Sequence, residues 1–461
     1  MINQLSESNN CKMKILIICS FYPPDSAISA VRPYMFAKYL SRLGNTVTVL
    51  RSGAFNSTPD ESYIKLKNIN VISYLGDKCD AELFDKNQFD NHKHIYAISK
   101  SNSKFRKYAI IRKIFHYLIE PINSKKRIKQ AKYNFNLQKR VIDSINEKYD
   151  VVISTYSELE NVFAGEYAAK HFGAKWIMDF RDSIVDHMNH NRYIWNLYAK
   201  KYEMFTLRKA DLCTTVSNGL RQELGHLYKN ASVITLYNGF DVEEKEEDNH
   251  CLYHNNTNNK LTICYTGQIY DLRLNGLKHF VVALKNLIEN KTISKDQISF
   301  VYAGRNSDIV SKLFDEHSIS DVLVDHGQIA RTQAIALQND SDVFLVLSWN
   351  TRSAKGILTG KFYEGIRANK PIISIVEGDI PNSELLELNS RYNYGFCYES
   401  CNKNMSSSDI ERYIYNLCNE KQKTGQIVYK PSQDLFNAFC YEGIVKKLYS
   451  SIEQICCVPE E

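Results

Sequence analysis

The sequence lacks the residue spacings that mark metal centres and disulfide frameworks. Its twelve cysteines are scattered over 461 residues, none forms a CxxC pair, and no histidine–cysteine grouping has structural-zinc spacing. No HExxH motif, EF-hand loop or clear Ser-His-Asp order occurs either. We therefore expect a protein of a reducing compartment that needs no bound metal and no tightly held cofactor.

Long apolar runs are also missing. The N-terminus, MINQLSESNNCK, has no basic stretch followed by an apolar segment of signal-peptide length. The apolar run Ile15–Cys19 is far too short to span a bilayer. These absences predict a cytoplasmic protein in which residues 1–12 form a disordered tail.

What is present is an alternation of strands and helices. KILIICSFYPP predicts a strand from Lys14 that ends at a loop, the next helix ends at Gly44, and Thr46–Leu50 is the second strand. Residues 13–240 continue this alternation and are predicted to form one Rossmann-like domain. Further strands are expected at Asp150–Ser154, Lys175–Met178, Leu212–Ser217 and Ser232–Gly239.

The second half repeats the pattern. The acidic, asparagine-rich stretch 241–260 has no apolar periodicity and is predicted to be a linker. Residues 261–434 form a second Rossmann-like domain, with strands at Leu261–Gly267, Ile298–Gly304, Asp342–Ser348 and Pro371–Val376. A last helix within 435–461 can pack back on the first domain. The fold class is thus α/β, with two doubly wound domains facing across a cleft.

A strongly basic segment spans 103–140. It holds twelve lysines and arginines against one carboxylate, Glu120, a local excess larger than the +6 of the whole chain. Its apolar side chains, such as Ile114 and Phe115, make it amphipathic, as segments that bind anionic membrane surfaces are. A solvated helix face is the alternative. Nucleic acid is not expected as a partner, because no nucleic-acid-binding motif accompanies the charge.

One short unit in the second domain predicts an anion site. In LTGKFYEGIRANKP, a helix begins after Thr359 and Gly360 and must end before Pro371. Its free N-terminal amides and Lys361 suit a phosphate, and Glu364, one turn on, suits ribose hydroxyls. An ordinary Lys–Glu surface pair is the alternative.

Three other loops at strand ends belong to the same prediction. Ser20–Arg32 has no GxGxxG pattern, which disfavours a dinucleotide binder. Met178–His187 concentrates charge at Asp179, Arg181 and Asp182, the candidate catalytic groups, although Asp179 and an arginine can equally form a structural pair. The loop after Gly267 offers Arg273 to a phosphate, with a surface arginine as the alternative.

In this order and spacing, the motifs resemble family 4 glycosyltransferases of the GT-B fold. The carrying stretches are MKILIICSFYPPDSAISAVRPYMFAKYLSRLGNTVTVL, WIMDFRDSI, ADLCTTVSNGLRQEL, LYNGFD, YTGQIYD, FVYAGRN, DHGQIARTQAIALQNDSDVFLVL and GILTGKFYEGIRANKPII. The resemblance covers nearly the whole chain except the tail, the basic segment and the linker.

The resemblance implies retaining transfer of a sugar from a nucleotide diphosphate sugar, usually without a metal, to a glycan or lipid-linked hydroxyl. The nucleotide would lie on the second domain and the acceptor on the first. Glu364 matches the ribose-binding glutamate of the family's E-x7-E motif, and Gly360 and Lys361 match the helix start that faces the diphosphate. The loop touching the base matches Gly327, Gln328 and Ile329.

Four departures from the family pattern concern the donor and the first loop. The first motif glutamate falls at Gly356, and the family's phosphate-binding arginine and lysine fall at Gln268 and Asn275, where Arg273 is a substitute. The glycine pair of the first loop is replaced by Ala27-Ile28-Ser29.

The predicted function is a glycosyltransferase of bacterial surface polysaccharide biosynthesis, cytoplasmic and peripheral on the inner face of the membrane. A nucleotide-sugar epimerase on the same fold and a non-catalytic scaffold in a polysaccharide assembly are the alternatives. The donor sugar, the base and the acceptor stay open, because pocket shape decides them.

Overall fold

A computed structural model describes residues 12–25, 27–53, 66, 68–75, 105–186, 192–243 and 259–457. For residues 105–118 it describes the helical backbone but not the side chains. The chain divides into two compact units. The first comprises Met1–Val216, Arg221–Leu236 and Val445–Glu461, and the second comprises Ser217–Leu220 and Tyr237–Ile444. The predicted tail and most of the predicted linker lie outside the described residues.

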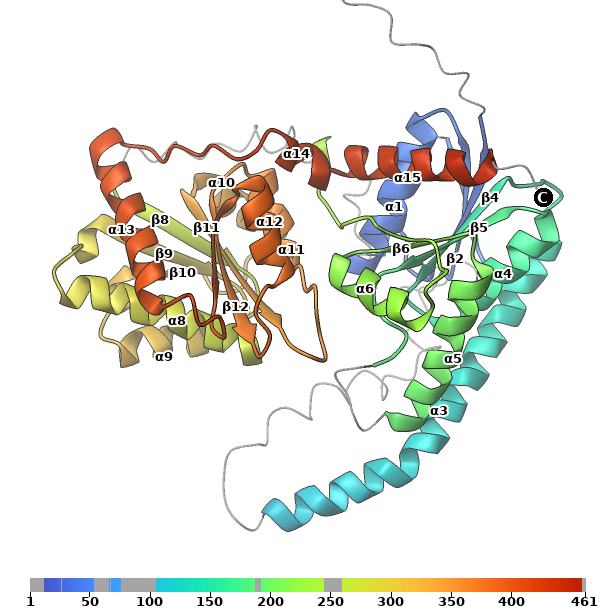
Figure 1. The fold of residues 1–461 in the computed structure, drawn as a ribbon, viewed down its shortest axis with the longest axis horizontal. Helices are drawn as coiled ribbons and strands as arrows, with labels where there is room; N and C mark the ends of the chain where they lie inside the picture. Colours follow the sequence, from blue (N-terminus) through green and yellow to red (C-terminus); the bar gives the residue numbers. More distant parts are fainter. Residues whose placement is uncertain are drawn as a thin grey trace, which may run out of the picture. The chain divides into compact units, whose positions relative to one another are not determined.

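The first unit is built on a parallel sheet of seven strands in the order β3-β2-β1-β4-β5-β6-β7 (Figure 1). Its inner strands are buried along nearly their whole length, because helices cover both faces of such a sheet. The strands are β1 (Lys14–Ile18), β2 (Thr46–Arg51), β3 (Ile69–Ser73), β4 (Val151–Tyr156), β5 (Lys175–Phe180), β6 (Leu212–Thr215) and β7 (Val233–Thr235).

Helices connect these strands. The helix α4 ends at Gly173, whose φ of 66° is a left-handed conformation that glycine adopts without steric cost. The C-terminal helix α15 belongs to this unit from Val445 onward, and Lys447 Nζ donates to the carbonyl of Thr235 at 2.9 Å. The helices are α1 (Ile28–Arg42), α3 (Phe105–Asp143), α4 (Leu159–Phe172), α5 (Tyr193–Lys209), α6 (Asn218–Leu227, its first three residues grouped with the second unit) and α15 (Tyr441–Cys456).

The second unit has a parallel sheet of six strands in the order β10-β9-β8-β11-β12-β13. The strands are β8 (Leu261–Thr266), β9 (Ile298–Ala303), β10 (Leu323–Asp325), β11 (Val343–Asn350), β12 (Ile372–Gly378) and β13 (Gly395–Glu399). The helices are α8 (Asp271–Glu289), α9 (Ser307–Glu316), α10 (Arg331–Asp340), α11 (Gly360–Arg367), α12 (Glu384–Tyr392), α13 (Ser407–Thr424) and α14 (Asp434–Phe439), with 3₁₀ turns at Lys295–Gln297 and Ser320–Val322.

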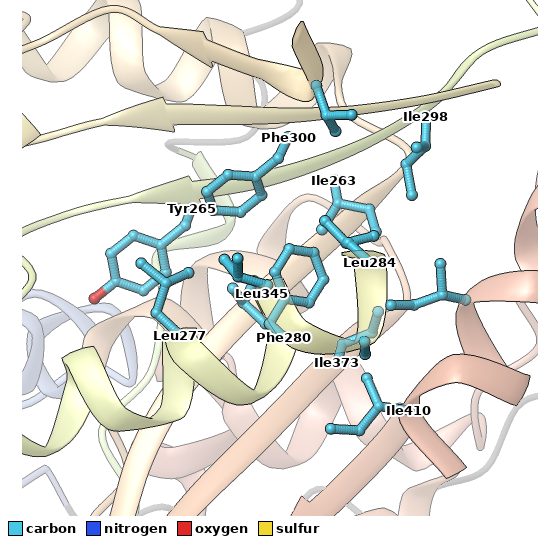
Figure 2. Packing of buried hydrophobic residues seen from close by; sticks show 14 of the residues in the cluster. Ile263, Tyr265, Leu277, Phe280, Leu284, Ile298, Phe300, Leu345, Ile373 and Ile410 are labelled. Atoms are coloured by element: carbon cyan, nitrogen blue, oxygen red, sulfur yellow. The ribbon is translucent and has the colours of Figure 1, made fainter. Parts of the chain in front are cut away.

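One face of this second sheet packs on α8 and α13. Figure 2 shows Phe280 and Leu284 of α8 directed at Phe300 and Leu345 of the sheet. The Phe280 and Phe300 ring centroids are 5.2 Å apart, within the range of favourable aromatic contacts. Because these side chains are fully buried, they hold α8 against the strands whose ends carry the candidate site.

The α/β prediction is confirmed, and every predicted strand is present. Three strands that are short or lie at sheet edges were not predicted: β3, β10 and β13. The prediction of a single C-terminal helix was wrong: α14 and α15 are separate. The two helices are separated at Cys440 because the main chain of Phe240 bonds there. The Phe240 amide donates to the carbonyl of Phe439, and the Phe240 carbonyl accepts from the amide of Tyr441.

A buried carboxyl group between α3 and α4 makes the first unit sensitive to pH. Glu160 is 5% exposed, and burial raises its pKa to about 7, with the Glu158 carboxylate adding to the shift and a hydrogen bond from Asn134 opposing it. Because the native state holds this proton more tightly than the unfolded chain, stability falls as pH rises from about 4.5 to about 7.

We expect Glu160→Gln to be more stable than the parent above pH 7, by up to about 3 kcal/mol, since the amide carries no charge and still accepts from Asn134. The advantage disappears below about pH 4.5, where the parent carboxyl is protonated in both states. Urea denaturation followed at pH 4, 6 and 8 measures it. Glu166→Gln on the same helix is the control, and an equal effect of the two variants would contradict the assignment.

Candidate functional site

The candidate site of the second unit lies at the carboxyl ends of its strands. The strands β8 and β11 are neighbours, and the chain leaves them toward opposite edges of the sheet. Loops at such a switch point diverge and leave room for a ligand. The loop after β8 starts at Gly267, and the loop after β11 leads to Thr359 and α11.

At this edge, main-chain hydrogen bonds connect the glycine-containing turns that follow β8, β9 and β10. The amide of Gly304, after β9, donates to the carbonyl of Gly327 at 2.7 Å, and the amide of Gly267 donates to Ala303 at 2.7 Å. A Cβ atom on Gly304 would lie 2.0 Å from the carbonyl oxygen of Gly267, so only glycine allows this approach. The structure thereby brings the predicted residues Gly267 and Gly327 together.

The N-terminus of α11 is open. Thr359 is the residue before the helix, and its side chain makes no capping hydrogen bond. Within the described part of the chain, the amides of Gly360 and Lys361 have no acceptor and the buried Thr359 hydroxyl has no partner. Gly360 is exposed, and the atom nearest to the position that a Cβ would take is a Glu364 carboxylate oxygen, at 3.9 Å. An anion could therefore accept from these amides.

Lys361 belongs to a polar network that the sequence analysis did not identify. Its Nζ donates to both Glu364 carboxylate oxygens at 2.7 Å, and Glu364 also accepts from Gln338 of α10. Gln338 is 2% exposed; it also donates to Thr266 at 2.6 Å and accepts from Arg367 at 3.0 Å. The network fixes the Glu364 carboxylate, which is itself about one-third exposed.

The Lys361 side chain also reaches the β8 loop. A Cβ on Gly267 would lie 3.1 Å from Cε of Lys361, so the two predicted groups from separate loops are adjacent. In the resulting arrangement an ammonium, two free amides and a carboxylate share one edge of the sheet. This combination can bind a phosphate beside a neutral hydroxylated group.

Arg273, in the first turn of α8, is held by the β8 loop. Its Nη1 donates to the carbonyl of Gln268 at 3.2 Å, and its guanidinium lies 4.7 Å from the ring centroid of Tyr270 and 5.8 Å from that of Trp349. Its Nε has no partner among the described residues. Trp349 had not been predicted, because a tryptophan at a strand end gives no distinctive pattern.

The predicted base-contacting residues lie after β10. Gly327 has a φ of 61°, and its amide donates to Asp325 at 2.8 Å, which shapes the turn. Gln328 is exposed and Ile329 is half-buried. Through Gly304 this turn is connected to Gly267, but nothing in the geometry assigns the two side chains a contact.

In the first unit, Asp179 is a structural residue. It is fully buried and accepts from Arg32 of α1 through Nε at 3.0 Å and Nη2 at 2.8 Å, and from Thr214 at 2.6 Å. Arg32 also donates to the carbonyl of Leu236 at 3.0 Å. With no exposed surface, this carboxylate cannot touch a substrate, so the prediction of a catalytic Asp179 is replaced by the structural alternative.

Arg181 and Asp182 follow β5. Arg181 donates to the carbonyl of Ser29, at the start of α1, at 2.8 Å, and Asp182 is exposed. The loop is shaped by Glu203 of α5, which accepts from the Ser183 hydroxyl and from the amides of Ile184 and Val185. Burial raises the pKa of Glu203. Of the three predicted groups, Asp182 is therefore the one with an accessible carboxylate.

Comparison with known proteins was informative only at the level of structure. No family model matches the chain, and no curated protein matches its sequence. A sucrose-phosphate synthase from Thermosynechococcus elongatus has a TM-score of 0.57 at 11% identity, over 96% of this chain and 99% of the other. An α,α-trehalose 6-phosphate synthase from Burkholderia multivorans has a TM-score of 0.60 at 10% identity, over 96% and 97%.

A lipopolysaccharide outer core galactosyltransferase is similar over 96% of this chain and 99% of its own, with a TM-score of 0.54 at 13% identity. These matches span both units and both sheets. The chain has the GT-B fold. The predicted fold class is thereby confirmed, while likeness at such low identity leaves the chemistry to the site itself.

The GT-B chain differs from the family pattern at Gly356 for a physical reason. Gly356 has a φ of 66°, and a Cβ there would lie 2.7 Å from both Oε2 of Glu384 and the hydroxyl of Ser217. Glu384 accepts from the amides of Asn218 at 2.7 Å and Gly219 at 3.1 Å, and burial raises its pKa. A glutamate at position 356 would not fit beside this carboxylate.

Two further observations concern metal ligands and membrane-spanning helices. Within the described residues, no three histidine, cysteine, aspartate or glutamate side chains converge as metal ligands would. No helix in that part of the chain combines the length and apolar content needed to cross a bilayer.

Removing one partner of the Arg32–Asp179 pair should destabilise the first unit. Arg32→Met and Asp179→Leu each leave a buried charge uncompensated, which costs about 3–5 kcal/mol, and the double variant should recover much of the loss. Urea denaturation followed by circular dichroism measures the three midpoints. Single variants with the parent midpoint would show that the pair is not structural.

Proposed function

We propose that the protein is a glycosyltransferase that uses a nucleotide diphosphate sugar bound on its second unit. The observation that carries the proposal is the open N-terminus of α11, where two unpaired amides and the Lys361 ammonium lie next to the Gly267 loop. A helix N-terminus of this kind favours a diphosphate through its amides and its dipole. The GT-B fold of proteins described as synthases and a galactosyltransferase supports this choice.

In the proposed complex the diphosphate accepts from the amides of Gly360 and Lys361, with Thr359 beside them. Lys361 already pairs with Glu364, so the diphosphate has to share its ammonium. Glu364, oriented by Gln338, accepts from the ribose hydroxyls. The base lies against the turn of Gly327, Gln328 and Ile329.

The chemical step breaks the bond between the anomeric carbon and the diphosphate oxygen, forms a bond between that carbon and the acceptor oxygen, and transfers the acceptor's proton to the departing diphosphate. Negative charge develops on the leaving β-phosphate, and the free amides, Lys361 and Arg273 stabilise it more than they stabilise the bound donor, which lowers the barrier. Asp182 orients the acceptor hydroxyl or faces the oxocarbenium-like sugar, and Arg181 supports its loop. Retention at the anomeric carbon, transfer without a metal and a role in bacterial surface polysaccharide synthesis are parts of the proposal.

The acceptor is proposed to be a hydroxyl of a glycan or of a lipid-linked saccharide. Ile28, which stands in the replaced glycine loop at the start of α1, is 86% exposed. We propose that this exposed side chain, at the start of the helix that follows β1, contacts an apolar part of the acceptor. A cytoplasmic enzyme at the inner face of the membrane fits such an acceptor.

Two other functions would be recognised by simple outcomes. A nucleotide-sugar epimerase would convert the donor alone, so nuclear magnetic resonance of a donor incubated without acceptor would show the epimer. A non-catalytic scaffold would show no stabilisation by uridine or guanosine diphosphate. A thermal-shift screen of nucleotide sugars therefore comes first, because a true donor raises the melting temperature by mass action.

Lys361→Ala should reduce kcat for sugar transfer, or for donor hydrolysis, by about 100- to 1,000-fold, as loss of one charge-stabilising donor does. Its melting temperature should stay close to that of the parent, because the side chain is half-buried and pairs within its own helix. Steady-state kinetics and thermal denaturation measure the two effects. Lys278→Ala, an exposed lysine of α8, is the control, and an unaltered kcat in Lys361→Ala would remove Lys361 from the mechanism.

Glu364→Gln should abolish discrimination for the ribose hydroxyls, while the variant should still bind the diphosphate. The parent is expected to bind the better of uridine and guanosine diphosphate about tenfold more tightly than its 2′,3′-dideoxy analogue, and the variant should bind both alike. The ratio is informative because the freed Lys361 changes both affinities equally. Titration calorimetry provides the constants, and an unchanged ratio would assign the ribose to another group.

A further inference from the structure

The helices α3 and α5 of the first unit expose many cationic side chains and few carboxylates. Glu120 of α3 accepts from the amides of Ile194 and Trp195, at 3.1 and 3.0 Å, and from the Ser124 hydroxyl at 2.6 Å, so it caps the start of α5. Glu203 of α5 is fully buried in the loop after β5. Asp143, the other acid with a described side chain in these helices, accepts from Tyr167 of α4.

Because Glu120 and Glu203 are used inside the unit and Asp143 is the one exposed acid with a described side chain, the two helices expose mainly cations. Arg127 stacks on Trp195 with a distance of 4.3 Å to the ring, and Lys139 and Arg208 lie over Tyr167 and Tyr228. Other lysines are exposed, and none has an ion pair within the described part of the chain: Lys125, Lys126, Lys129, Lys132, Lys200, Lys201 and Lys209.

Three of these lysines line one groove. Lys125, Lys129 and Lys132 share a face of α3, because they follow helical spacing, and Tyr198 and Tyr202 of α5 form the opposite wall. Ile128 also lines the groove, which encloses about 410 Å³. Among the described residues, no acidic side chain lines it, so its ammonium groups have no counter-charge from that part of the chain.

Large apolar side chains are exposed on the same two helices. Ile122 and Tyr133 of α3 are 54% and 59% exposed, and Leu197 and Phe205 of α5 are 62% and 36% exposed. A soluble anion such as inorganic phosphate would use the lysines but leave these side chains in water. A bilayer surface of anionic phospholipids satisfies both, since its phosphates face the ammoniums and its interfacial region accepts tyrosine and aliphatic groups.

We propose that this surface, formed by the exposed side chains of α3 from Ile122 to Tyr133 and of α5 from Leu197 to Lys209, docks on anionic phospholipid membranes. The groove of Lys125, Lys129, Lys132, Tyr198 and Tyr202 receives a lipid phosphate. The whole docking surface is called the α3–α5 surface. The membrane contact predicted from the sequence is confined to 103–140, whereas the structure adds α5 and removes Glu120 as a repelling charge. Docking depends on residues separate from those proposed for sugar transfer.

The test uses the full chain and vesicles of phosphatidylcholine with and without 30% phosphatidylglycerol. We expect binding only to the anionic vesicles, with affinity falling steeply as NaCl rises from 50 to 500 mM. The variant Lys125→Ala/Lys129→Ala/Lys132→Ala should lose about 100-fold in partition coefficient, by the usual contribution of a lysine near an anionic surface. Cosedimentation measures the bound fraction.

The matched control removes three exposed lysines from the second unit, Lys403→Ala/Lys423→Ala/Lys430→Ala, and thus the same net charge. Equal losses in the two triple variants would overturn the proposal, because general charge would then explain binding. Leu197→Ser should weaken vesicle binding several-fold but leave binding of inorganic phosphate unchanged. Binding to pure phosphatidylcholine at the same affinity, or vesicle binding fully blocked by millimolar inorganic phosphate, would also overturn it, the latter indicating a soluble anion.

Discussion

The candidate site depends on the main-chain contact that joins the turns after β8, β9 and β10. The amide of Gly304 donates to Gly327, and the carbonyl of Gly267 occupies the space that any side chain on Gly304 would need. This contact places the Gly267 loop against Lys361. If the turns separated, the amides of α11 would still be free, but the groups around a bound phosphate would no longer converge.

Within each unit, buried polar side chains set the position of the exposed ones. Gln338 connects Thr266 of the sheet with Glu364 and Arg367 of α11, and Glu203 and Arg32 do the same for the loop and strand that carry Asp182. A buried polar group costs free energy unless it is bonded, so each network has one well-defined arrangement. The same principle applies to α3 and α5, where the carboxylates of Glu120 and Glu203 are used internally and ammonium groups are left on the surface.

The chain has the GT-B fold but departs from the family 4 resemblance at a position that the resemblance assigns to donor binding. That position is Gly356. Its left-handed backbone is allowed, but the carboxylate of Glu384 occupies the space for a glutamate side chain. In our proposal the donor sugar therefore meets a different set of groups from those the resemblance implies, and Arg273, beside Tyr270 and Trp349, is one of the charged groups among them.

The sequence alone determined the two alternating domains, the start of α11 and the strand ends that bear Gly267 and Asp182, because these depend on local apolar periodicity and on glycine and proline positions. It did not reveal the roles of Gln338, Glu203, Glu120 and Glu384, whose partners on other elements lie 18 to 166 residues away in the chain. Asp179 shows the difference most clearly. Its position at a strand end was readable from the pattern, but only the packing of α1 on the sheet brought Arg32 to it and closed it off from solvent, since burial and pairing are properties of the folded chain.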